Sequence, residues 1–373
     1  MTTKLGVIAL SKPEYGGTYQ YTLSTLQALR HVTGFAVTLY GDPTNAEFQA
    51  LGFPISPFSE SRKDQLKSLV TYRLRKRLSD PYASEDIVLA PIYALTLLHT
   101  SKPFAFALHD LQERYYPENF SLLQRTWHHQ VYDALLARAR RVICESQYVQ
   151  SDIARFFGID RSRIAVMPAP PQSQFLIPQS AGQLAAARVR LKLPEKFLFY
   201  PAQFWPHKNH LRLIEAFAGV AAEVSDAKLV LTGKARDEYA AVMAAIDKLG
   251  LKEKVLHLGF LETADLQSVY QLATALVMPS LFESVSIPIY EAFQVGTPVA
   301  ASNILAIPEQ VGDAALLFDP TSSASIKQAM LTLLKDPQTA AALVARGRAR
   351  MSAMTPQRYG AELQEVLQQL QRG

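Results

Sequence analysis

The sequence lacks the features that mark secreted and membrane proteins. Its 373 residues include one cysteine, so no disulfide can form within the chain, and nothing calls for an oxidising compartment. The longest apolar stretch, residues 87–98, is interrupted by Pro91 and falls far short of the about 20 residues that a membrane span needs. The apolar run at residues 5–10 is too short for a signal-peptide core. We therefore expect a cytoplasmic protein.

Several signatures of other protein classes are also missing. There is no Gly-x-Gly-x-x-Gly and no Walker loop, which disfavours dehydrogenases and P-loop enzymes. His207 and His210 have no Cys or carboxylate partner at ligand spacing, so we expect no metal site. Basic segments without interleaved aromatic residues or a recognised module disfavour a nucleic-acid partner.

The residues that are present describe a globular chain of about two domains. Hydrophobic residues make up 49% and charged residues 19%, enough apolar material for two cores. The formal net charge of +5 favours anionic partners in general, such as nucleotide phosphates or acidic lipid surfaces.

Short apolar runs alternate with longer amphipathic segments, the pattern of parallel sheets covered by helices. Strands are predicted at residues 5–10, 35–40, 86–90, 103–108, 141–144 and 164–167, and again at 197–201, 228–231, 255–258, 275–278, 298–301 and 315–318. A segment rich in Pro, Gln and Ser separates the two sets. The sequence thus predicts an α/β protein with two doubly wound, Rossmann-like domains, 1–180 and 181–355, whose strand ends border a shared ligand cleft.

The densest cluster of polar residues follows the strand at 275–278. Glu283 lies in the loop after that strand, Pro288 stands where a first helical turn begins, and Glu291 lies one turn into the helix, which Gly296 closes. Helix N-termini bind phosphate, and a nearby carboxylate accepts hydrogen bonds from ribose hydroxyls. Without further context, the two acids equally fit a role in complementing the dipole of their own helix.

Three other strand ends carry candidate residues. Lys208 precedes a helix and is suited to neutralising a diphosphate, although an exposed basic loop residue is the ordinary alternative. Gly16 and Gly17 follow the first strand and allow close approach of a ligand, or simply form a tight turn before a helix that begins near Tyr19. His109 ends an apolar strand, where a lone histidine is more often structural.

Residues 62–78 have the apolar spacing of a helix and seven basic side chains. Such a helix is suited to contact with an anionic membrane or a pyrophosphate-linked acceptor. A solvated helix that packs its leucines inward is the simpler interpretation.

Taken together, these motifs resemble the family 4 retaining glycosyltransferases of the GT-B fold. Glu283 and Glu291 match the family's E-x7-E signature. The resemblance spans nearly the whole chain and includes, in order, Gly16-Gly17, His109-Asp110, the segment from Cys144 to Ile153, Lys208-Asn209, Leu231-Thr232-Gly233, residues 257–260 and residues 307–320.

The resemblance implies a role for each motif residue. Glu291 is expected to bind the donor ribose, Lys208 the diphosphate, and His109 the sugar near its reacting carbon. Glu283 is expected to hold the transferred sugar. Backbone amides around Ser284, Val285, Ser286 and Ile287 are expected to share that contact, with Gly233 and the Gly16-Gly17 loop also at the donor. The first domain is expected to bind the acceptor and the second the donor, with a closing helix at about 356–373 returning to the first domain.

Two positions depart from the family pattern. Many members have glycines after the first glutamate, where this chain has Ser284-Val285-Ser286, and an arginine six positions before the lysine, where it has Ala202 followed by Gln203.

The function expected from this resemblance is transfer of a hexose from a UDP- or GDP-sugar to a glycan or lipid-linked saccharide, with retention of configuration. No Asp-x-Asp occurs, so neither a metal nor another cofactor is expected. Polysaccharide or lipopolysaccharide biosynthesis is the expected setting. Residues 62–78 are the segment expected to contact an anionic membrane, if the protein binds one. The alternatives are a sugar-nucleotide epimerase of the same fold and a non-catalytic sugar-nucleotide or glycan-binding protein.

Overall fold

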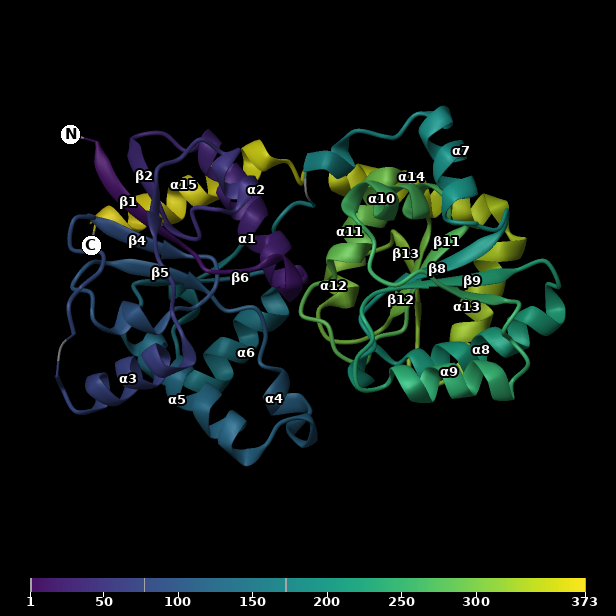
Figure 1. Ribbon diagram of the computed structural model, residues 1–373, viewed down its shortest axis with the longest axis horizontal. Helices are drawn as coiled ribbons and strands as arrows, with labels where there is room; N and C mark the ends of the chain where they lie inside the picture. Colours follow the sequence, from purple (N-terminus) through teal and green to yellow (C-terminus); the bar gives the residue numbers. More distant parts are fainter. Residues whose placement is uncertain (1, 77, 172, 373) are drawn as a thin grey trace. The chain divides into compact units, whose positions relative to one another are not determined.

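The computed structural model describes residues 2–76, 78–171 and 173–372. The chain forms two compact units (Figure 1). Unit 1 comprises Met1–Gln172 and Met354–Gly373, and unit 2 comprises Ser173–Ala353. Each unit is built around one sheet of parallel strands covered by helices, as the alternating pattern of the sequence predicted.

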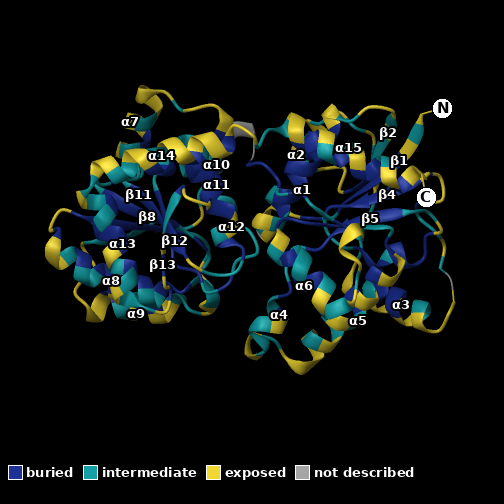
Figure 2. Ribbon diagram, turned by 180° about the vertical axis from the view of Figure 1, so that it is seen from behind, coloured by how far each residue is buried: buried dark blue, intermediate teal, exposed yellow. Residues whose placement is uncertain are grey.

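The sheet of unit 1 has the strand order β3-β2-β1-β4-β5-β6-β7. Its strands are β1 (Thr3–Ala9), β2 (Phe35–Gly41), β3 (Ile55–Pro57), β4 (Ile87–Ala90), β5 (Phe104–Ala107), β6 (Arg141–Cys144) and β7 (Ile164–Val166). The sequence did not predict β3, because three residues ending in proline are too short to show a period. Strands β4 and β5 are buried throughout (Figure 2).

Helices cover both faces of this sheet. They are α1 (Gly17–Ala28), α2 (Ala46–Gln49), α3 (Arg62–Arg73), α4 (Gln112–Tyr115), α5 (Leu122–Arg138), α6 (Gln147–Phe157) and α15 (Pro356–Arg372), with short 3-10 turns η1 (Pro13–Tyr15), η2 (Leu29–His31), η3 (Leu95–Leu98), η4 (Pro117–Asn119) and η5 (Arg161–Arg163). Leu5 and Val7 of β1 pack with α1 and α15, whereas Ile8 packs with α5 on the opposite face. Side-chain alternation along the strand produces these two cores.

The C-terminal helix α15 belongs to unit 1 although α14 precedes it in unit 2. Its buried side chains are Tyr359, Leu363, Val366, Leu367 and Leu370, which follow helical spacing and join the core beneath α1. Burial of this apolar stripe fixes α15 on unit 1.

The basic segment at 62–78 differs from its prediction. The helix α3 begins at the Ser61 capping box and ends at Arg73, and position 77 lies outside the described residues. Leu69 is buried, but Leu66, Val70 and Leu74 are exposed. The interpretation that this helix packs its leucines inward is therefore wrong for Leu66 and Leu74.

The sheet of unit 2 has the order β10-β9-β8-β11-β12-β13. Its strands are β8 (Phe197–Pro201), β9 (Lys228–Thr232), β10 (Val255–His257), β11 (Ala275–Met278), β12 (Val299–Ser302) and β13 (Ala315–Phe318). Its helices are α7 (Ala181–Arg190), α8 (His210–Glu223), α9 (Tyr239–Lys248), α10 (Thr263–Leu272), α11 (Ile287–Val295), α12 (Ile307–Val311), α13 (Ser323–Lys335) and α14 (Pro337–Met351), with 3-10 turns η6 (Ser173–Leu176) and η7 (Pro206–Lys208). All six strands were predicted to within one residue at either end. No helix in the described part of the chain is long and apolar enough to cross a membrane.

Candidate functional site

The central strands β8 and β11 of unit 2 are parallel neighbours, so the loops that follow them lie at the same edge of the sheet. Two hydrogen bonds position these loops: the first joins the loop after β8 to β8 itself, and the second joins the two loops. The Tyr200 hydroxyl donates to the carbonyl of Lys208 at 2.8 Å, and the amide of Leu281 donates to the carbonyl of His207 at 2.7 Å. The turn η7 is thereby held against the loop after β11.

Asn209 fixes the start of α8 in the same place. Its backbone adopts the left-handed conformation with φ 60°, which asparagine tolerates better than most residues. Its buried side-chain amide donates to the carbonyls of Pro279 at 2.8 Å and Pro320 at 2.9 Å. One residue therefore anchors three loops of the edge and sets the position of the preceding Lys208.

Lys208 and Glu283 form an ion pair at this edge. The Lys208 Nζ lies 2.6 Å from the Glu283 Oε1, and the two side chains are 21% and 11% exposed. The structure thus brings together the cation and one of the two acids that the sequence singled out. In partly buried surroundings such a pair is screened less than on the open surface. An incoming phosphate can take Lys208 as its counter-ion, and Glu283 is then available to accept hydrogen bonds.

Glu291 lies inside unit 2, on α11. Its side chain is buried, and the Tyr270 hydroxyl donates to its Oε2 at 2.7 Å. Its Oε1 is also buried and has no hydrogen-bond partner among the described residues. Burial raises the pKa of Glu291 to about 7, against a lowering by the Tyr270 hydrogen bond. A buried oxygen without a partner is rare in native proteins and indicates a place for a ligand or water donor.

The start of α11 is held by Gln310 from α12. The Ser286 amide donates to the Gln310 Oε1 at 2.9 Å, and the Gln310 Nε2 donates to the Ser286 carbonyl at 2.7 Å. The amide of Ser286 is therefore already paired, which narrows the expected sugar-binding amides to those of Ser284, Val285 and Ile287. The Ser286 hydroxyl is buried without a partner in the described structure.

Two histidines lie beside Lys208 in the sequence, His207 partly buried and His210 in the core. His210 is fully buried and stacks on the Phe204 ring with a centroid distance of 4.2 Å. Burial lowers the pKa of His210 to about 3 and that of His207 to about 4. Both rings are thus neutral over the physiological range. Across residues 2–76, 78–171 and 173–372 no group of three or more His, Cys, Asp or Glu residues is arranged to hold a metal ion.

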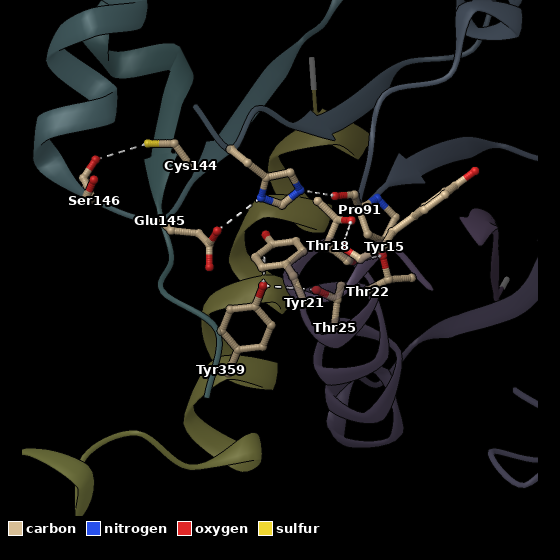
Figure 3. A network of polar contacts seen from close by, with 11 residues as sticks. Tyr15, Thr18, Tyr21, Thr22, Thr25, Pro91, Cys144, Glu145, Ser146 and Tyr359 are labelled. Carbon is tan, nitrogen blue, oxygen red and sulfur yellow. Dashed lines mark hydrogen bonds and ion pairs between the residues drawn. The ribbon is translucent and has the colours of Figure 1, made fainter. Parts of the chain in front are cut away.

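In unit 1, three adjacent strands place His109 between two acceptors (Figure 3). Pro91 follows β4, His109 follows β5 and Glu145 follows β6. The His109 Nδ1 lies 3.1 Å from the Glu145 Oε2, and its Nε2 lies 3.0 Å from the Pro91 carbonyl oxygen. Tyr21 of α1 packs edge-on to the ring at a centroid distance of 4.5 Å. Both ring nitrogens of His109 are therefore engaged by the protein.

Two family models match successive parts of the chain. Residues 15–170 match the model described as Glycosyltransferase Family 4, and residues 185–350 match Glycosyl transferases group 1. The chain belongs to the family 4, group 1 glycosyltransferases.

Among curated relatives of this glycosyltransferase is the O-antigen chain mannosyltransferase RfbU of Salmonella typhimurium. It is 25% identical over 89% of this chain and 91% of its own length. Among solved structures, sucrose-phosphate synthase from Thermosynechococcus elongatus superposes with a TM-score of 0.79 at 20% identity, covering 99% of each chain. The structure of Anabaena HepE in complex with UDP and glucose superposes with a TM-score of 0.79 at 20% identity, covering 98% of this chain and 99% of its own. These likenesses show the GT-B fold.

The glycine motifs of this glycosyltransferase have clear backbone reasons. Gly16 has φ 62° and precedes α1, which begins at Gly17, two residues before the predicted start. Gly233 has φ 125°, and a Cβ there would lie 2.3 Å from the carbonyl oxygen of Ala202. These positions require glycine whether or not a ligand approaches, so their ligand roles stay predictions.

Sequence reasoning missed several residues of these sites. Tyr270, Glu145 and Gln310 each contact a predicted residue from another element, and no local pattern shows such contacts. Arg236 was also missed. Its Nε donates to the Gln203 Oε1 at 2.7 Å, and its guanidinium lies 5.1 Å from the Trp205 ring centroid. The one sequence signal that pointed toward Arg236 was Gln203, a polar residue next to Ala202, the position where many family members have an arginine.

Proposed function

We propose that this glycosyltransferase moves a hexose from a nucleotide diphosphate sugar to a glycan or lipid-linked saccharide, with retention of configuration and without a metal ion. The observation that supports donor binding by unit 2 is the Lys208–Glu283 ion pair. The loop that carries Glu283 continues into α11, and on that helix Glu291 has a buried oxygen without a partner among the described residues. The resemblance to family 4 enzymes supports retention.

The proposed roles follow from the charges that develop during transfer. Breaking the bond between sugar and phosphate leaves negative charge on the diphosphate, and a preorganised cation lowers that barrier. Lys208 supplies the cation without a metal, and Arg236 is a second cation, held at the loop after β8 by Gln203. Glu291 accepts from or donates to a ribose hydroxyl, and Glu283 accepts from the hydroxyls of the transferred sugar.

The relatives suggest which substrates to test first. The mannosyltransferase relative makes mannose the first sugar and an O-antigen intermediate of lipopolysaccharide the first acceptor. HepE was solved with UDP and glucose, so UDP-sugars are tested beside GDP-sugars.

We also propose that unit 1 contacts an anionic membrane through the segment around α3. Leu66, Val70 and Leu74 are exposed there. A hollow of about 450 Å³ adjoins the end of the helix and is lined by Tyr72, Arg73, Arg75, Lys76, Leu98 and Arg138. Exposed apolar side chains beside a cationic hollow fit the interface of an anionic bilayer.

Lys208→Ala tests the donor site. We expect release of nucleoside diphosphate from a UDP- or GDP-sugar to fall by about 100-fold, as for loss of one charge-stabilising group, while chelator leaves the wild-type rate unchanged. The matched control is Lys252→Ala, which removes an exposed lysine of unit 2 that pairs with Asp247.

Circular dichroism of each variant shows whether unit 2 remains folded. Equal turnover by Lys208→Ala and wild type would contradict the site, and loss of wild-type activity in chelator would contradict the metal-independent reaction. An epimer formed without acceptor would favour the alternative enzyme class.

A further inference from the structure

The surroundings of His109 fix the hydrogen-bonding role of each ring nitrogen. A carbonyl oxygen only accepts hydrogen bonds, so the Nε2 carries a hydrogen that it donates to the Pro91 carbonyl. The Nδ1 faces the Glu145 Oε2 at 3.1 Å. When Glu145 is ionised it also only accepts, and the Nδ1 must then carry a second hydrogen. A ring held between these two acceptors is an imidazolium.

The charged groups near the ring favour this form. Both are acidic: Glu145 at the end of β6 and Asp110, the next residue in the chain. Tyr21 of α1 contributes a ring edge, and its hydroxyl accepts from that of Tyr359 on α15 at 3.2 Å (Figure 3). Burial alone lowers the pKa of His109, but the hydrogen bond and charge of Glu145 outweigh burial and raise the pKa above its usual value.

We propose that Glu145 is a positioning residue that keeps His109 doubly protonated, so that His109 acts in sugar transfer as a fixed positive charge and not as a proton donor or acceptor. Both ring nitrogens are occupied by Glu145 and Pro91, so a substrate contact of the ring is made through its charge. Such a preorganised charge stabilises negative charge on a group that contacts the ring. The catalytic consequence rests on the proposed function, whereas the protonation state does not.

The protonation state is measured directly by NMR of the full protein labelled with 15N-histidine. His109→Gln identifies the ring signals among the eight histidines. We expect both ring nitrogens of wild-type His109 to be protonated at about pH 7, because an adjacent carboxylate favours the charged ring. In Glu145→Gln we expect a neutral ring protonated at Nε2 only, with its titration midpoint at lower pH than in the wild type. A neutral wild-type ring, or an unchanged midpoint in Glu145→Gln, overturns the proposal.

The kinetic test separates positioning from a merely structural role. Glu145→Gln is expected to shift the pH profile of kcat to lower pH, with activity restored in part where the ring is again protonated, and Glu145→Asp is expected to keep the wild-type profile. A structural defect would lower kcat evenly at all pH values and would overturn the proposal. Glu118→Gln, at an exposed acid of the same unit, is the matched control.

Failure of the proposed function has a different signature. If the wild-type protein turns over no sugar nucleotide, the NMR measurement still decides the protonation of His109. A doubly protonated ring that depends on Glu145 then supports the positioning role, and a neutral ring overturns it.

Discussion

At the scale of single residues, Glu291 shows how burial creates a group poised for binding. The carboxyl is buried, receives one hydrogen bond from Tyr270, and keeps one oxygen without a partner in the described structure. The E-x7-E spacing singled out this residue, but neither its contact with Tyr270 nor its raised pKa could be predicted, because both depend on packing between α10 and α11.

The raised pKa predicts a pH dependence of stability. Folded Glu291 titrates at about 7, above the usual 4.5, so the folded protein binds the proton more tightly than the unfolded chain does. The free energy of unfolding therefore falls as pH rises between these values, and the loss persists above them. Glu291→Gln is expected to remove this decline, measured by urea denaturation at pH about 5 and about 8. An equal decline of the free energy of unfolding with pH in the variant and the wild type would contradict the assignment.

At the scale of elements, the two ends of α11 show what sequence can and cannot reveal. Pro288 and Gly296 mark the two ends of α11 correctly, because the fixed φ of proline suits a first turn and glycine adopts the left-handed cap. The clamp of Gln310 on Ser286 has no such local signal. It joins α12 to α11, and Arg350 of α14 in turn donates to the Gln310 carbonyl at 3.1 Å.

The helix α3 carries the prediction that belongs to this scale. Periodicity predicted an amphipathic helix but not which apolar residues face solvent, since that depends on what η3 and the sheet cover. We expect the wild-type protein to cosediment more with vesicles that contain anionic lipid than with neutral vesicles. The double variant Arg75→Ala/Lys76→Ala is expected to lose most of this difference, because each basic residue contributes about 1 kcal/mol to the binding free energy at an anionic surface.

The control for the vesicle experiment is a pair of basic residues elsewhere on the surface. Lys252→Ala/Lys228→Ala removes the same charge from unit 2, so it separates a local effect from one of net charge. Equal recovery of the wild-type protein with neutral and anionic vesicles would count against membrane contact by this segment.

At the scale of the whole molecule, the alternation of strands and helices was readable because buried parallel strands are continuous apolar runs. The runs at 141–144, 275–278 and 315–318 match their strands residue for residue. The short β3 gave no such run. The loops after the strands were harder to predict, because contacts such as Glu145 with His109 and Asn209 with Pro320 join residues that are distant in the sequence.

The most direct test of the proposed function is the transfer reaction itself. Purified protein is given GDP-mannose or a UDP-hexose with a lipid-linked O-antigen acceptor in the presence of chelator, and the product is analysed by NMR. We predict one nucleoside diphosphate released for each glycosidic bond formed, and an anomeric configuration identical to that of the donor. Inverted configuration, a requirement for added metal, or nucleotide release without a glycosidic product would contradict the account.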